Sequence, residues 1–205
     1  CFRKKAFWRK LVEAFAKKWM LAAAAEATIE VNPGTADLDK LRFFKDLGFD
    51  RISFGVQSLN DAELRAVGRI HTANEALDAI TMAEKAGFTR VSADLIYGLP
   101  EQSLQTLKTS LQNLTAAGLQ HLSVYGLTIE KNTPLAGMLD KGKVELPDED
   151  CQAGNDMNWY RSIWKHRDCI RYEISNYAVS GQESSITLFT GIICRICLLA
   201  VPLQL

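Results

Sequence analysis

Segments typical of β-strands alternate with segments of helical length through the middle of the chain. The strand candidates are rich in Ile, Val and aromatic residues and lie at 28–31, 51–56, 90–96 and 121–127. The segments between them have the apolar spacing of amphipathic helices and lie at 37–47, 73–86 and 104–117. Because strands separated by helices of this length need crossover connections, the pattern predicts the α/β class with a parallel sheet.

Charged and amide side chains occur where these strands end, and ligands bind at the carboxyl ends of parallel strands. The candidates at this edge are Glu30, Gln57, Arg69 and Asp94. Any one of them alone is better explained by an ordinary turn or surface role. Together, two carboxylates can hold a ribose diol or an amine, while Arg69 and Gln57 can hold a carboxylate. The set predicts a site for a nucleoside that carries an amino acid.

Composition and charge restrict the class of protein. The chain has 205 residues, 47% of them hydrophobic, with 24 Lys and Arg against 24 Asp and Glu. This fits a globular domain and argues against a protein that holds nucleic acid by bulk charge. Five unevenly spaced cysteines without a signal peptide predict a reducing, cytoplasmic location. The first residue is Cys1 rather than Met, so we expect a fragment.

The two ends of the chain differ from the middle. Residues 1–20 are basic, and Phe7, Leu11, Phe15 and Trp19 recur with helical spacing. Packing against the sheet is the favoured interpretation, and peripheral membrane association is the alternative. After residue 134 the alternation stops, and we expect a helix at about 147–164 and a last short strand at 171–178.

Histidine and cysteine patterns predict no metal site in this chain. His71 has no partner at metal-ligand spacing, so a structural hydrogen-bonding role is favoured over acid, base or ligand chemistry. Cys194 and Cys197 have CxxC spacing, but no second pair accompanies them. They lie in an apolar tail, 186–205, which is long enough to cross a membrane but carries Arg195 near its centre.

Five segments, taken together, resemble radical S-adenosylmethionine proteins related to oxygen-independent coproporphyrinogen III oxidase. They are TIEVNPGT at 28–35, RISFGVQS at 51–58, GRIHTA at 68–73, DLIYGLP at 94–100 and YEISNYA at 172–178. Within this family, the segments at 68–73, 127–134 and 172–176 are more similar to the HemW-like haem chaperone branch than to the oxidase.

The resemblance implies a partial (β/α)6 TIM-like barrel that binds S-adenosylmethionine (SAM) and a [4Fe-4S] cluster, truncated here at its N-terminal strands. In the chaperone branch it also implies haem binding and delivery of haem to acceptor proteins. The alternatives are an oxidase that oxidatively decarboxylates a porphyrin substrate, coproporphyrinogen III, and a nonfunctional truncated product. By motif position, the SAM contacts are Glu30, Gln57, Arg69 and Asp94, with Thr128 as a weaker candidate.

Two departures from the family pattern affect these expectations. The CxxxCxxC loop and the glycine-rich strand end of the family would lie upstream of Cys1, so no cysteine of this chain is expected to bind the cluster. Read two bases later, codons for residues 185–191 can give the family-like sequence His-Asn-Pro-Ile-Tyr-Trp. We therefore expect a frameshift near Ser184 and divide the chain into an incomplete barrel at 1–135, a final strand and the start of a C-terminal region at 136–184, and an out-of-frame tail at 185–205.

Overall fold

The computed structural model describes residues 2–19, 26–147 and 168–185. Apart from Pro147, the helix expected at 147–164 lies outside the described residues, as does the tail at 186–205 with its two cysteines.

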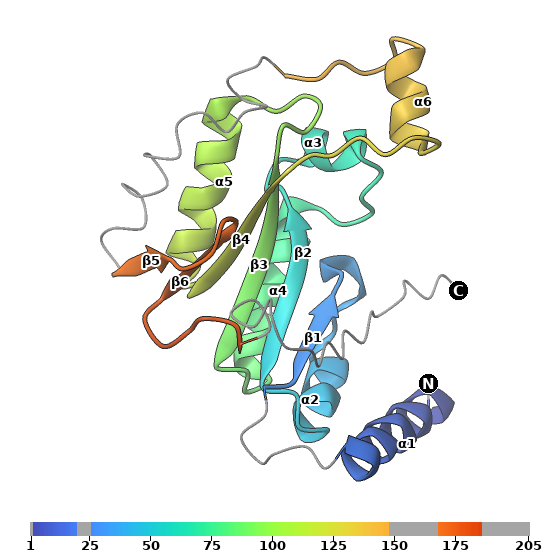
Figure 1. Ribbon diagram of the computed structural model, residues 1–205, viewed down its shortest axis with the longest axis vertical. Helices are drawn as coiled ribbons and strands as arrows, with labels where there is room; N and C mark the ends of the chain where they lie inside the picture. The colour runs from blue at the N-terminus through green and yellow to red at the C-terminus, as the bar shows by residue number, and fades with distance from the viewer. Residues whose placement is uncertain (1, 20–25, 148–167, 186–205) are drawn as a thin grey trace.

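A single six-stranded sheet forms the centre of the molecule (Figure 1), with the strand order β1-β2-β3-β4-β6-β5. The strands are β1 (Thr28–Val31), β2 (Arg51–Gln57), β3 (Arg90–Tyr97), β4 (His121–Gly126), β5 (Cys169–Arg171) and β6 (Asn176–Val179). Strands β1 to β4 pair in parallel, which confirms the prediction for the four segments named above. Strand β6 pairs antiparallel with β4 and with β5.

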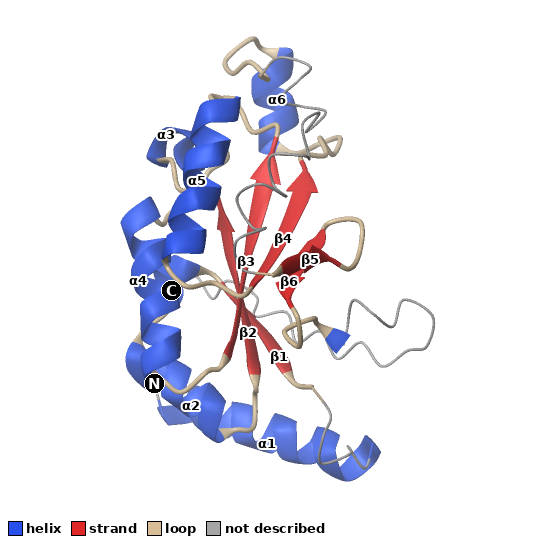
Figure 2. Cartoon of the chain, turned by 90° about the vertical axis from the view of Figure 1, so that its left-hand side faces the viewer, coloured by secondary structure: helices blue, strands red, loops and turns tan. Residues whose placement is uncertain are grey.

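Helices connect the parallel strands. The helices are α1 (Phe2–Trp19), α2 (Leu38–Asp46), α3 (Asp61–Ala66), α4 (Ala73–Lys85), α5 (Leu104–Ala116) and α6 (Pro134–Asp140), with a 3-10 turn, η1, at Pro33–Thr35. Helices α2, α4 and α5 line one face of the sheet, and the β5–β6 hairpin lies on the side away from them (Figure 2). The described part of the chain is therefore an α/β half-barrel.

Local sequence signals fix where the helices begin and end. The side chain of Asp37 accepts a hydrogen bond from the Lys40 amide at the start of α2. A reciprocal capping box between Thr72 and Glu75 begins α4, in which each side chain accepts a hydrogen bond from the other's backbone N–H. After α4, Gly87 has φ +94°, which a residue with a Cβ rarely adopts, and the chain can turn there into β3.

The hydrophobic core lies between the sheet and these helices. Alternate strand residues such as Ile52, Phe54 and Leu95 are fully buried there, against helix residues such as Ile80 and Leu111. The intervening strand residues are largely polar and point to the opposite face, because side chains alternate along a strand. The sheet therefore has one apolar face and one polar face.

The single strand expected at 171–178 is wrong, since this segment is a hairpin. Strand β5 ends at Arg171 and β6 begins at Asn176. Between them, the Glu173 carboxylate accepts hydrogen bonds from the Ser175 amide at 3.1 Å and from the Asn176 side chain at 2.7 Å. These local bonds stabilise a turn in place of a continuous strand.

The N-terminal amphipathic helix exists and packs on α2. The Trp8 ring meets Phe44 edge-on at 5.4 Å between ring centroids, and Lys5 and Arg9 lie over the Phe43 ring. Phe7, expected on the buried stripe, is 61% exposed because Trp8 faces α2 instead. No helix in the described ranges is long and apolar enough to span a membrane.

Candidate functional site

The polar face of the sheet carries the candidate site. Ser53 on β2 donates a hydrogen bond to Asp94 on β3, with 3.3 Å between Oγ and Oδ1. Ser123 stands beside Asp94 in the parallel register of β3 and β4, and its hydroxyl also hydrogen-bonds the Asp94 carboxylate. Glu30 on β1 stands beside Ser53 in the same way. Four adjacent strands thus contribute polar groups to one region.

Asp94 is the electrostatic centre of this region. Burial raises its pKa to about 6, and the negative charge of Glu30 adds to the rise. Hydrogen bonds from Ser123 and Ser53 and the Arg69 cation oppose the rise without cancelling it. Asp94 lies three residues before the end of β3, one residue deeper in the strand than the expected range 90–96 implied. The strand is longer because β3 stays paired with β4 as far as Tyr97.

Arg69 approaches Asp94 from the loop between α3 and α4. The side chain is half-buried, and burial lowers its pKa while the Asp94 charge acts in the opposite direction. Across the described residues, no carboxylate oxygen lies within 4.0 Å of the Arg69 guanidinium. A cation and a carboxyl therefore lie close enough to influence each other without an ion pair between them.

Gln57, the last residue of β2, has an unusual backbone conformation. Its φ is +67°, and the Ser58 amide donates to the Val56 carbonyl at 2.8 Å across it, which makes Gln57 the centre of a γ-turn. Its side chain folds back over the strand, because a Cβ on Gly55 would lie 3.0 Å from Gln57 Nε2. Strained backbone of this kind persists where surrounding structure enforces it, often at binding sites.

His71 supports this turn from behind. It is 3% exposed, and its Nε2 donates to the Val56 carbonyl at 3.1 Å. Burial lowers its pKa, so the ring is neutral at physiological pH. This confirms the structural role favoured from the sequence.

Thr128 is not brought into the site by any contact among the described residues. It is exposed, two residues beyond β4, and the neighbouring Leu127 amide donates to the Tyr97 carbonyl at 2.9 Å. Glu30 and Arg69 therefore lie close enough to Asp94 for their charges to affect its pKa, and Gln57 ends the adjacent strand β2. Thr128 makes no contact with these residues in the described part of the chain.

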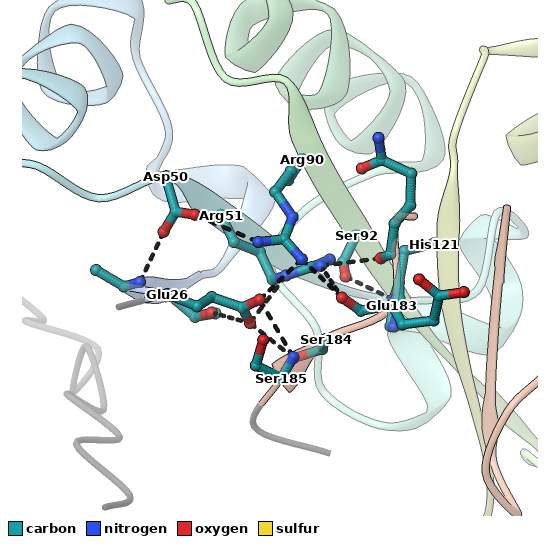
Figure 3. A network of polar contacts seen from close by, with 12 residues as sticks. Glu26, Asp50, Arg51, Arg90, Ser92, His121, Glu183, Ser184 and Ser185 are labelled. Carbon is teal, nitrogen blue, oxygen red and sulfur yellow. Dashed lines mark hydrogen bonds and ion pairs between the residues drawn. The ribbon is translucent and has the colours of Figure 1, made fainter. Parts of the chain in front are cut away.

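A second polar cluster closes the opposite end of the sheet, where the parallel strands begin (Figure 3). Arg51 and Arg90 both bind Glu26, at 3.1 Å and 2.9 Å, and both donate to the Glu183 carbonyl. Beside them, His121 hydrogen-bonds Ser92 and Tyr172. These contacts hold residues 182–185 against the end of the sheet where the parallel strands begin.

The comparisons with known proteins agree with this geometry. The sequence profile of the radical SAM superfamily matches residues 5–114, more than half of the chain. The chain belongs to the radical SAM superfamily. The expected α/β partial barrel is therefore confirmed.

The relatives found are considerably longer than this chain. Heme chaperone HemW of Lactococcus lactis is 34% identical over 176 residues, which cover 85% of this chain and 46% of that protein. The mouse mitochondrial protein named radical S-adenosyl methionine domain-containing protein 1 is 37% identical over 175 residues, covering 85% and 39%. The chain spans less than half the length of these relatives.

A solved structure has the same fold. Coproporphyrinogen III oxidase (HemN) from Escherichia coli, described as a radical SAM enzyme, superposes with a TM-score of 0.73 over 90% of this chain and 42% of its own. At 24% sequence identity this likeness establishes the fold alone.

The residues on the polar face suit SAM but not an iron–sulfur cluster. SAM offers an ammonium, a carboxylate and a ribose diol, and the half-buried Arg69 and Asp94 lack an ion-pair partner among the described residues. Over the same residues, no group of three or more His, Cys, Asp or Glu side chains is arranged to hold a metal ion. Cys169 lies on the edge strand β5, and burial raises its pKa to about 12.

Ser53, Ser123 and His121 belong to these sites but were not predicted from the sequence. Each lies on a strand with alternating polar residues, whereas a strand buried on both faces is apolar throughout. That alternation in 51–57, 92–94 and 121–125 was the available signal for a polar face.

Proposed function

We propose that this chain is the SAM-binding part of a HemW-like radical SAM haem chaperone. The observation that carries the proposal is the grouping of Glu30, Arg69 and Asp94 on the polar face, with Gln57 at the adjacent strand end. Carboxylates suit the ribose diol and the ammonium of SAM, and Arg69 suits its carboxylate.

The Arg69 assignment is tested by equilibrium dialysis of SAM against the 205-residue chain. Arg69→Met keeps the length of the side chain but removes the cation, so we expect SAM affinity to fall about tenfold, as for one lost charge-assisted hydrogen bond. Arg65→Met on the exposed side of α3 is the matched control and should leave affinity unchanged. Equal affinities in the two variants would remove Arg69 from the site.

Haem delivery is proposed because the relatives named heme chaperone HemW cover most of this chain. The complete protein would retain haem and pass it to an acceptor protein without converting a porphyrin. The alternative is oxidative decarboxylation of coproporphyrinogen III, because the HemN structure that shares this fold is named a coproporphyrinogen III oxidase. Haem retention without turnover supports the chaperone, whereas vinyl formation under anaerobic, reducing conditions supports the oxidase.

Several expectations stay predictions. These are the cytoplasmic location, peripheral membrane association through the basic helix, the [4Fe-4S] cluster, Thr128 as a SAM contact, and the division at 135 and 184.

A further inference from the structure

A buried carboxyl group joins the two loops that follow β2 and β3. Glu63 on α3 is 0% exposed. Its Oε2 accepts a hydrogen bond from the Ser58 hydroxyl at 2.6 Å and another from Gln102 Nε2 at 3.0 Å. Ser58 belongs to the loop after β2 and Gln102 to the loop after β3, so one oxygen atom connects both.

On the β2 side, this bond fixes the residue next to the strained turn. Ser58 follows Gln57 directly, and its hydroxyl also accepts from the Asn60 amide at 2.9 Å. On the other side of Gln57, the Val56 carbonyl is held by His71. Both neighbours of Gln57 are therefore anchored, which is the condition under which a positive φ persists in a residue other than glycine.

On the β3 side, Gln102 organises the loop that follows the strand of Asp94. Its Oε1 accepts from the amides of Gly98 at 2.7 Å and Leu99 at 3.3 Å. Its Nε2 donates to the Ile96 carbonyl at 3.0 Å as well as to Glu63. The Gln102 side chain thus hydrogen-bonds both N–H and C=O groups of this loop's backbone, and it also binds Glu63.

Stability alone is a poor explanation for a carboxyl group at this position. In the described parts of the chain, no Lys, Arg or His nitrogen lies within 4.0 Å of Glu63. Its Oε1 is buried and has no hydrogen-bond partner there. Burying such a group carries a desolvation cost that a leucine of similar volume would avoid.

We infer that Glu63 is a positioning residue that couples the loop of Gln57 to the loop of β3, so that the two sides of the polar face keep one geometry. The consequence for SAM affinity rests on the proposed function. The coupling between the loops does not.

The test compares Glu63→Leu with Glu63→Gln, which retains an accepting oxygen at the same place, and with the exposed control Glu84→Gln. Hydrogen exchange measured by mass spectrometry follows the peptides that contain Gly98 and Leu99, with α4 as an internal reference. SAM affinity is measured on the same samples. A residue that only stabilises the fold would lower the melting temperature without changing these local readouts at a temperature where every variant is folded.

In Glu63→Leu we expect the Gly98 and Leu99 amides to exchange about tenfold faster, although Glu63 does not contact them, and SAM affinity to fall by a similar factor. Glu63→Gln should stay within twofold of wild type in both readouts. Wild-type exchange at Gly98 and Leu99 in Glu63→Leu would overturn the inference. If wild type fails to bind SAM, the proposed function fails while the exchange result still decides the coupling.

A second variant covers the case in which Glu63→Leu does not fold. Gln102→Met keeps the bond between Ser58 and Glu63 but removes the connection to the loop after β3. We expect faster exchange at Gln57 and Ser58, on the far side of Glu63. Unchanged exchange at those two amides would overturn the inference.

Discussion

Arg51 and Glu26 form a buried ion pair, with 3.1 Å between Nε and Oε1 and side chains only 2% and 4% exposed. Arg51 also donates through Nη2 to the carbonyls of Gln182 and Glu183, at 2.9 Å and 2.8 Å. The guanidinium therefore joins the first strand segments to the last described segment of the chain.

Replacing Arg51 by Met should destabilise the chain by about 3 kcal/mol or more, because the Glu26 carboxylate stays buried and loses a partner. Urea unfolding followed by circular dichroism measures this loss. Arg65→Met, an exposed change of the same kind, should cost less than about 0.5 kcal/mol. A similar loss of stability in both variants would show that the buried ion pair contributes no more to stability than an exposed arginine does.

His121 should make the fold sensitive to acid. Burial, reinforced by Arg51 and Arg90, lowers its pKa from 6.5 to about 3. Between these values the unfolded chain binds a proton that the folded chain does not, so stability falls as the pH drops from 6.5 towards 3. His121→Gln should remove this contribution, and the difference in unfolding free energy between the two proteins should therefore change across this range. A constant difference from pH 7 to pH 4 would contradict the assignment.

Asp94 should have the opposite effect on the pH dependence of stability from His121. Its pKa is raised from 3.8 to about 6, so the folded chain binds a proton more readily than the unfolded chain. The stability from this group is fully present below pH 3.8 and is lost as the pH rises through 6. Asp94→Asn should therefore stabilise the chain at pH 7.5, by about 2 kcal/mol, and the gain should disappear towards pH 4. Thermal unfolding at the two pH values decides this, and a gain independent of pH would count against a buried carboxylate.

Relieving the backbone strain at Gln57 should change the stability of the chain and its SAM affinity in opposite directions. Gln57→Gly removes the Cβ at φ +67° and should raise stability by roughly 0.5–1 kcal/mol while weakening SAM binding. Asn132→Gly, at φ +66° in an exposed loop, is the matched control and should leave SAM affinity unchanged. Unaltered SAM affinity in Gln57→Gly would exclude the side chain from the site.

The sequence was sufficient to predict the four parallel strands and the three helices between them, because each has a clear period. The sequence did not predict α3 and α6, because helices of six and seven residues contain too few turns to show a helical period of apolar residues. The hairpin around Glu173 was missed because side-chain bonds to the backbone decide it.

The candidate site was predictable in its residue types but not in its geometry. The strand-end pattern indicated Glu30, Gln57, Arg69 and Asp94, and the pairing of β3 with β4 continues three residues past Asp94 to Tyr97. The bond from Ser53 to Asp94 and the bond from Gln102 to Glu63 join residues 41 and 39 positions apart. Such contacts follow from register and packing, which a single sequence does not specify.

The most direct test of the account is calorimetric titration of SAM into the wild-type chain, Asp94→Asn and the exposed control Asp78→Asn. We predict measurable binding by wild type and by Asp78→Asn with the same affinity, and binding about tenfold weaker or more by Asp94→Asn, because the amide lacks the charge that holds an ammonium or a ribose diol. Equal affinities in all three proteins, or no binding by wild type, would contradict the assignment of the polar face as the SAM site.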